Sequence, residues 1–216
     1  MNWFPNFTCM ACDCEIQTST NAYLCPKCME KLPIMTETQT THFSPFYYEE
    51  PVRSMILKLK YDSNGFVAKA LAPYLAAVYL KHIQPVYDQP PIIVPVPLHR
   101  SRQRERGYNQ SEVLARELAS YLDLPVVSDA LVRSHKTIIQ KHMDAETRAA
   151  NMQGAFTVLP TQALRIQNQN ILLLDDVYTT GATTNACATA LRANGARNII
   201  ILTIASVGTG TESFAD

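Results

Sequence analysis

The segment at residues 170–185 constrains the fold more than any other part of the 216-residue chain. Its apolar residues 171–174 are too few to form a helix face, and they are typical of a strand buried on both sides. Asp175 and Asp176 follow where this strand leaves the sheet, at the edge where open α/β sheets bind ligands. We therefore expect a parallel sheet with a polar site at the end of this strand.

A hydroxyl-rich turn comes next. Gly181 is free to take positive φ, so that successive backbone N–H groups can converge on an anion. A helix expected over 184–194, stopped by Gly195, would direct its positive end at the same anion. The turn is not a Walker A loop, because no Lys follows its single glycine. The residues of this candidate phosphate loop are Val177, Tyr178, Thr179, Thr180, Gly181, Ala182 and Thr183.

An anion site beside two carboxylates suits a ribose 5-phosphate, whose 2′- and 3′-hydroxyls can donate to the acids. Residues 172–183, Leu-Leu-Leu-Asp-Asp-Val-Tyr-Thr-Thr-Gly-Ala-Thr, resemble the phosphoribosyl-pyrophosphate (PRPP) motif of type I phosphoribosyltransferases. The alternative is an ordinary tight turn with solvated acids, which does not require this whole string. The resemblance implies that Asp175, Asp176 and residues 177–183 bind PRPP, and that the two acids favour the developing cation in catalysis.

Five of the six cysteines lie within the first 28 residues, in a chain without a pattern for export. Cys9 with Cys12 and Cys25 with Cys28 form two C-x-x-C pairs, which can complete the four-thiolate shell of a structural Zn²⁺. Cys14 is close enough to compete as a zinc ligand, but only one residue separates it from Cys12, whereas the turn that presents two thiolates to one zinc ion is formed by a C-x-x-C pair. We therefore predict Cys9, Cys12, Cys25 and Cys28 as the ligands. Free thiols would leave the doubled spacing unexplained, and a redox site needs only one pair.

Length and charge limit the remaining possibilities. Lys plus Arg total 19 and Asp plus Glu total 19, so a globally basic nucleic-acid binder is not indicated, although a local patch is allowed. No apolar run reaches the roughly 20 residues that span a bilayer, and residues 1–12 lack a signal-peptide pattern. We expect no membrane insertion and a cytoplasmic location. We expect a zinc-binding module at 1–35 and a phosphoribosyltransferase-like domain at 36–216.

The intervening chain alternates helix and strand patterns. Helices are expected over 52–61, 66–83 (interrupted at Pro73) and 110–122, and strands at 46–48, 92–94 and 198–205. Residues 95–109 are expected to form an arginine-rich loop at the same sheet edge as the acids. His99, Arg100 and Arg106 in this loop are candidates for holding the pyrophosphate.

Several motifs together resemble the ComF family, phosphoribosyltransferase-like proteins linked to bacterial competence for transformation. They are Pro-Val-Pro-Leu-His at 95–99, Arg-Glu-Arg-Gly-Tyr-Asn-Gln at 104–110, Leu-Lys-Leu-Lys-Tyr at 57–61, Arg-x-x-Asn-x-x-Gly-Ala-Phe at 148–156, the two C-x-x-C pairs and the PRPP motif. They cover nearly the whole chain, with Cys14 as a departure. The resemblance implies an α/β fold, a type I phosphoribosyltransferase-like parallel sheet flanked by helices, with a small N-terminal zinc-binding module. It also implies a flap at 126–156.

The same resemblance implies a PRPP-binding protein that handles incoming single-stranded DNA with other DNA-uptake proteins. Mg²⁺ would accompany PRPP, and DNA contacts would come from the arginine-rich loop, Lys58 and Lys60. Two other functions stay open: a metabolic phosphoribosyltransferase with a small acceptor, and a PRPP-sensing regulator without turnover. Phosphoribosyl transfer, its acceptor and the oligomeric state are left open.

Overall fold

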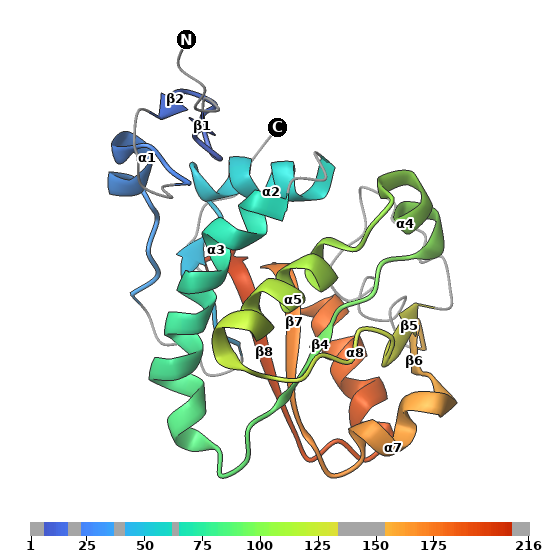
Figure 1. Ribbon diagram of the computed structural model, residues 1–216. Helices are drawn as coiled ribbons and strands as arrows, with labels where there is room; N and C mark the ends of the chain where they lie inside the picture. Colours follow the sequence, from blue (N-terminus) through green and yellow to red (C-terminus); the bar gives the residue numbers. More distant parts are fainter. Residues whose placement is uncertain (1–6, 17–22, 37–41, 62–64, 134–153, 209–216) are drawn as a thin grey trace.

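A four-stranded parallel sheet forms the centre of the protein (Figure 1). The computed structural model describes residues 7–16, 23–36, 42–61, 65–133 and 154–208. The strands lie in the order β3-β8-β7-β4, and their carboxyl ends share one edge. Their bounds are β3 (Phe46–Tyr47), β4 (Ile92–Pro95), β7 (Asn170–Tyr178) and β8 (Asn198–Ser206). The expected parallel sheet is confirmed, but β7 runs past 174, so that both acids lie inside the strand.

Helices cover both faces of this sheet. On one face, Leu172 and Leu174 of β7 share a core with α2 (Val52–Tyr61), α3 (Gly65–Val78) and α5 (Gln110–Leu122). On the other face, Ile171 and Leu173 pack with α8 (Ala182–Ala193), as Figure 1 shows behind the sheet. Alternate residues of one strand therefore enter two different cores, which explains its unbroken apolar run.

The helix patterns are confirmed with one difference. The buried residues of α2 are Val52, Met55, Ile56 and Leu59, the stripe that the spacing predicts. α3 runs without a break through the exposed Pro73 and continues into the π-helical η1 (Tyr79–Ile83) and the 3₁₀ turn η2 (Gln84–Val86). Within the described part of the chain, no helix is both long and apolar enough to cross a membrane.

The arginine-rich segment is a helix, and the expectation of a loop was wrong. α4 (Arg100–Arg106) begins after His99, whose side chain accepts a hydrogen bond from the backbone N–H of Ser101. It ends at Gly107, which takes the left-handed conformation with φ of 79°. A capped start, good helix formers and a glycine stop are together sufficient for a short helix.

The N-terminal segment packs on the main core. It contains β1 (Phe7–Thr8) paired with β2 (Glu15–Ile16), followed by α1 (Pro26–Glu30). Cys9, Cys25 and Cys28 are buried in the same cluster as the apolar residues of α2 and α3. This segment therefore shares the core of the larger unit, and the domain boundary at residue 35 stays a prediction.

A second, smaller sheet lies beside α8. It pairs β5 (Leu131–Arg133) with β6 (Phe156–Val158) in antiparallel fashion and leads into η3 (Pro160–Gln162) and α7 (Ala163–Ile166). Residues 134–153 lie outside the described residues, and most of the expected flap falls there. The flap therefore stays a prediction.

Candidate functional site

The two acids of β7 are almost fully buried, with 9% of Asp175 and 7% of Asp176 exposed. Asp175 Oδ1 accepts hydrogen bonds from Ser111 Oγ at 3.1 Å and from the backbone N–H of Asp176 at 2.9 Å. Burial, followed by the negative charge of Asp176, raises the pKa of Asp175 to about 7. Asp175 is therefore partly protonated near neutral pH.

Asp176 is the acid that is paired with a cation. Lys60 at the end of α2 places its Nζ 3.1 Å from Asp176 Oδ2. Gln110 at the start of α5 donates from Nε2 to the same oxygen at 3.0 Å. Two helices from the same side of the sheet thus converge on this carboxylate and compensate for its burial.

The start of α5 is fixed close to both acids. Asn109 caps the helix by accepting a hydrogen bond from the backbone N–H of Ser111 at 3.1 Å. Its amide group donates to the backbone oxygen of Val96 at 3.0 Å, which attaches the cap to the segment after β4. The cap therefore fixes the first turn of α5, and with it Ser111 and Gln110, beside the two acids.

The candidate phosphate loop lies between β7 and α8. Gly181 takes a left-handed conformation, with φ of 74°, at the N-cap of α8. The expected helix starts at Ala182, two residues earlier than predicted, and Gly195 follows its end with φ of 83°. Thr179 and Thr180 are exposed. The loop therefore presents hydroxyl groups at the N-terminus of a 12-residue helix, an arrangement that favours anions.

Tyr178 supports this loop from one side. A Cβ atom at Gly181 would lie 2.8 Å from Tyr178 Cζ, so the tyrosine fills the space that a side chain would need. The Tyr178 ring stacks on His42, with ring centroids 3.5 Å apart. Burial lowers the pKa of His42 to about 4, which makes it neutral at physiological pH. The side chains of Tyr178 and Val177, both predicted to bind PRPP, therefore serve packing.

The three residues expected on the pyrophosphate side have different positions. Arg106 donates to Gln110 Oε1 at 3.1 Å and so joins the network around Asp176. His99 caps α4, and Arg100 is exposed in the first turn of that helix. The side chains that hydrogen-bond or pair with the acids are Ser111, Gln110 and Lys60, from α5 and α2.

Arg133 is a further cation near the acids that was not predicted as a site residue. It lies in β5, with its guanidinium carbon 5.4 Å from the ring centroid of Phe156. Burial, followed by the positive charge of Arg102, lowers the pKa of Arg133, and the charge of Asp175 opposes this effect. β5 thus adds positive charge to the same edge of the sheet.

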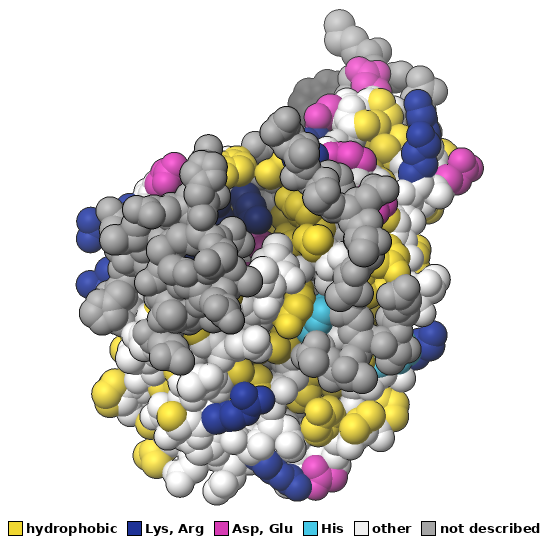
Figure 2. All heavy atoms as spheres, turned by 180° about the vertical axis from the view of Figure 1, so that it is seen from behind, with side chains coloured by type: hydrophobic (Ala, Val, Ile, Leu, Met, Phe, Trp, Pro, Cys, Tyr) yellow, Lys and Arg dark blue, Asp and Glu magenta, His cyan; other side chains and the backbone are white. Residues whose placement is uncertain are grey.

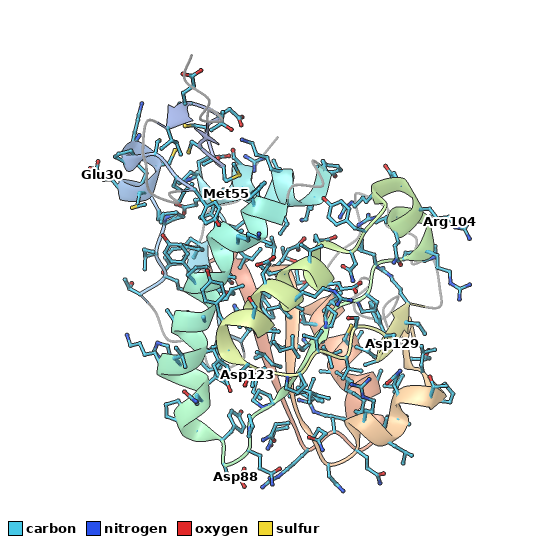
Figure 3. The ribbon with its side chains drawn as sticks, viewed as in Figure 1. Glu30, Met55, Asp88, Arg104, Asp123 and Asp129 are labelled. Carbon is cyan, nitrogen blue, oxygen red and sulfur yellow. The ribbon has the colours of Figure 1, made fainter. Side chains whose placement is uncertain are left out.

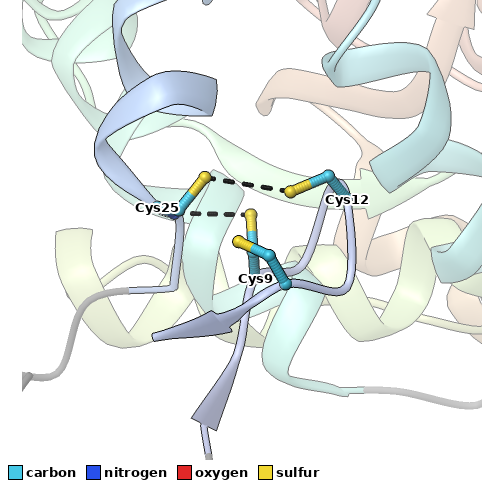
Figure 4. Close-up of side chains that lie close together, drawn as sticks. Cys9, Cys12 and Cys25 are labelled. Atoms are coloured by element: carbon cyan, nitrogen blue, oxygen red, sulfur yellow. Dashed lines mark hydrogen bonds between the residues drawn. The ribbon is translucent and has the colours of Figure 1, made fainter. Parts of the chain in front are cut away.

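The N-terminal cysteines form a second candidate site. Figure 4 shows the side chains of Cys9, Cys12 and Cys25 pointing toward one another. The sulfur atoms of Cys9, Cys12, Cys14 and Cys25 all lie within 4.8 Å of one another. Cys28 is buried in α1, and burial, followed by the neighbouring thiols of Cys12 and Cys25, raises its pKa. The geometric set thus includes Cys14, which was expected to be a spare thiol, in the place of Cys28.

This cluster fits a tetrahedral metal ion that prefers sulfur. Cys12 Sγ and Cys25 Sγ are 3.8 Å apart. Zinc–sulfur bonds of about 2.3 Å place the corners of a tetrahedron at about the same separation. The backbone N–H of Cys25 also donates to Cys9 Sγ at 3.3 Å, which joins the two C-x-x-C segments.

Comparison with known proteins identifies the family. A profile described as "Phosphoribosyl transferase domain" matches residues 109–213. The chain is 31% identical to "Competence protein F" of Haemophilus influenzae over 193 residues, which cover 88% of this chain and 81% of that protein. The chain belongs to the ComF family.

Two other relatives of this ComF protein have lower coverage. "DNA utilization protein YhgH" of Escherichia coli strain K12 is 32% identical over 180 residues, covering 82% of this chain and 76% of that protein. "Competence protein ComFC" of Bacillus subtilis is 26% identical over 155 residues, covering 70% and 58%. These matches confirm the resemblance that the motifs indicate.

Sequence reasoning missed the partners of the acids in this ComF protein. Lys60 was predicted only to contact DNA. Gln110 and Ser111 were predicted to lie in a helix and not to contact the acids. Asn109 before a periodic segment is a recognisable capping signal, and it locates the start of α5. No sequence signal places the end of α2 beside β7, because that contact depends on the packing of the helix.

We expect Gly181→Ala to lower the free energy of unfolding by at least about 1 kcal/mol, because an L side chain is strained at this φ and its Cβ would meet Tyr178. Gly65→Ala is the control, since it has open space and no positive φ. It should leave stability unchanged or raise it slightly. Urea denaturation of both variants measures the difference, and equal stabilities would contradict the packing described for the loop.

Asp175 predicts a pH dependence of stability. The pKa of Asp175 is raised to about 7 in the folded protein, whereas the pKa of an Asp in the unfolded chain is about 3.9. The folded state therefore binds more protons between these values, and stability should fall as pH rises from about 4 to about 7. Asp175→Asn should flatten this fall, while Asp123→Asn, at an exposed site, should retain it. Denaturation across this pH range tests the assignment, which fails if both variants behave alike.

Proposed function

We propose that this ComF protein binds PRPP at the carboxyl edge of its sheet and handles incoming single-stranded DNA, in the cytoplasm and with other DNA-uptake proteins. The observation that carries the proposal is the structure of β7 and its loop. β7 carries two buried acids, and the loop that follows it lies at the N-terminus of α8, where anions are favoured. Sugar hydroxyls and a phosphate on one ligand match this pair of features.

In this proposal, residues 179–183 hold the 5′-phosphate through hydroxyl and backbone N–H groups. Asp175 and Asp176 accept hydrogen bonds from the ribose hydroxyls, with Ser111 and Gln110 holding the two carboxyl groups in place. Arg106 and the N-terminal end of α4 lie on the pyrophosphate side. The oxygens of Asp175 and Asp176 suit Mg²⁺, which when bound with PRPP would supply positive charge that stabilises the leaving pyrophosphate.

If transfer occurs, the acids have a second role. Loss of pyrophosphate leaves positive charge on the ribose ring, as in glycoside cleavage. The negative charge of Asp176, held in place by Lys60 and Gln110, favours that cation. The proposal assigns these steps to the chain and leaves the acceptor open.

α4 is the part of the described chain that best suits DNA phosphates. Arg100, Arg102 and Arg104 are exposed on this helix, and Arg104 points away from the sheet in Figure 3. On the face shown in Figure 2, the coloured Lys and Arg side chains lie in separate groups. Electrostatic contact through α4 is compatible with zero net charge, because only a local patch is needed. Relatives named for competence and DNA utilization support this role.

The cysteine cluster is proposed to hold a structural zinc ion. Its donors are thiols at tetrahedral spacing, and the surrounding segment contributes buried residues to the main core. Zinc would therefore fix the loop between Cys9 and Cys14 against α1 and α2. Cys14 and Cys28 are the two candidates for the fourth ligand.

PRPP binding is tested by calorimetric titration with PRPP and Mg²⁺. We expect Asp176→Asn to weaken binding at least about tenfold, because a charged hydrogen-bond acceptor is lost. Asp88→Asn, which removes an exposed ion pair with Arg197 before β4, should bind normally. Equal affinity in the two variants would refute the ribose assignment. A repeat with short single-stranded DNA present should change the PRPP affinity, and independent binding would count against the DNA role.

Zinc binding is tested by measuring the metal content of purified variants. Wild type should carry about one zinc per chain, and Cys25→Ser should lose most of it. Cys187→Ser, a buried thiol in α8 away from the cluster, should retain the metal. Full occupancy in Cys25→Ser would rule out the site. The zinc contents of the single variants Cys14→Ser and Cys28→Ser, compared with each other, show which thiol is the fourth ligand.

A further inference from the structure

The last turn of α2 is attached to the cysteine loop. Lys58 Nζ donates to Asp13 Oδ1 at 2.6 Å and to the backbone oxygen of Ala11 at 3.3 Å. Both acceptors lie in the loop between Cys9 and Cys14, which the metal would hold. Lys58 therefore connects the position of the helix to the position of this loop.

The same turn reaches the acid site. Lys60 pairs with Asp176 at 3.1 Å, and the exposed fractions of the two side chains are 20% and 10%. Residues two apart in a helix point in different directions, so Lys58 and Lys60 can contact separate sites. Asp176 is therefore held by a helix that the cysteine loop also holds.

Neighbouring residues fix the turn from the side of α4. Tyr108 donates from its hydroxyl to the backbone oxygen of Leu59 at 2.6 Å. The guanidinium carbon of Arg106 lies 5.1 Å from the ring centroid of Tyr61. The turn is thus in contact with the cysteine loop, the acid site and the arginine-rich segment.

Core packing makes this connection stiff. Met55, Ile56 and Leu59 of α2 are fully buried in one cluster with Cys9 and Cys25. Because protein cores are close-packed, a change in the cysteine loop displaces the residues that it contacts and is not absorbed locally. A movement of the cysteine loop can therefore reach α2 in two ways, through the hydrogen bonds of Lys58 and through the packing of the apolar residues of α2.

We propose that metal binding at the cysteine cluster and PRPP binding at Asp176 are coupled through this turn, with Lys60 as a positioning residue for Asp176. The inference rests on the proposed function, since it concerns regulation of the same site. A bound metal fixes the loop, the loop fixes Lys58, and α2 then keeps Lys60 on Asp176. Lys60 and Gln110 then hold the Asp176 carboxylate in one orientation, so that it is positioned to accept hydrogen bonds from sugar hydroxyls.

The coupling is measured by titrating the full chain with PRPP and Mg²⁺, zinc-loaded and after chelation under reducing conditions. We expect zinc to raise PRPP affinity about threefold to fivefold, a size typical of partly exposed ion pairs. Linkage requires that saturating PRPP raise zinc affinity by the same factor. A zinc site without coupling to the acid site would show neither change.

Asp13→Asn separates the coupling from metal binding. Asp13 has φ of 59°, a conformation that Asn also tolerates, so the loop backbone should be retained. The zinc-loaded variant should keep its full metal content and lose about threefold to fivefold in PRPP affinity. Asp88→Asn, which also loses an exposed ion pair, is the control and should bind PRPP like wild type.

The outcomes distinguish this inference from the proposed function. If wild type does not bind PRPP, the proposed function fails. If wild type binds PRPP but zinc-loaded Asp13→Asn binds it equally well, the coupling fails and the function stands. Loss of zinc from Asp13→Asn would place this residue in metal binding and also overturn the coupling through Lys58.

The role of Lys60 is tested with two substitutions, one that removes its positive charge and one that keeps it. Lys60→Met should weaken PRPP binding about tenfold, because Asp176 loses its cation. Lys60→Arg keeps the positive charge and should retain most of the affinity. An equal loss of PRPP affinity in both variants would mean that the positive charge at residue 60 does not matter. That result would contradict the proposed ion pair between Lys60 and Asp176 as the positioning contact.

Discussion

The burial of two adjacent carboxyl groups at the end of β7 is the constraint on which the rest of the site depends. Buried acids are unfavourable unless hydrogen bonds or cations compensate. Here Ser111 and Gln110 bring the positive end of α5, and Lys60 brings the end of α2. The orientation of both helices is therefore tied to the chemistry of one strand.

This compensation also decides which cations are available for other partners. Lys58 and Lys60, which were expected to contact DNA, make ion pairs with Asp13 and Asp176 in this structure, and their contact with DNA stays a prediction. The exposed arginines of α4 then become the basis of the proposed DNA contact. A chain with zero net charge can thus divide its basic residues between a ligand site and a local external surface.

The sequence predicted most elements because local patterns were strong. The apolar stripe of α2, the buried run of β7 and the glycine stop of α8 all behave as their spacing indicates. The prediction was wrong at α4, where charge suggested a loop and capping produced a helix. The side chain of Tyr178 packs against Gly181 and His42, and its predicted contact with PRPP stays a prediction.

The α/β class, the family, the position of the two acids, the turn between β7 and α8 and the clustered cysteines were all predictable from the sequence, because each follows from residues that are close together in the chain. The three-dimensional arrangement was needed to show which cations reach the acids, that Asp175 and Asp176 have unlike surroundings, and that Cys14 lies within the thiol cluster. These features join residues far apart in sequence, such as Lys60 and Asp176. Their proximity is set by how helices pack on a sheet, which no local pattern encodes.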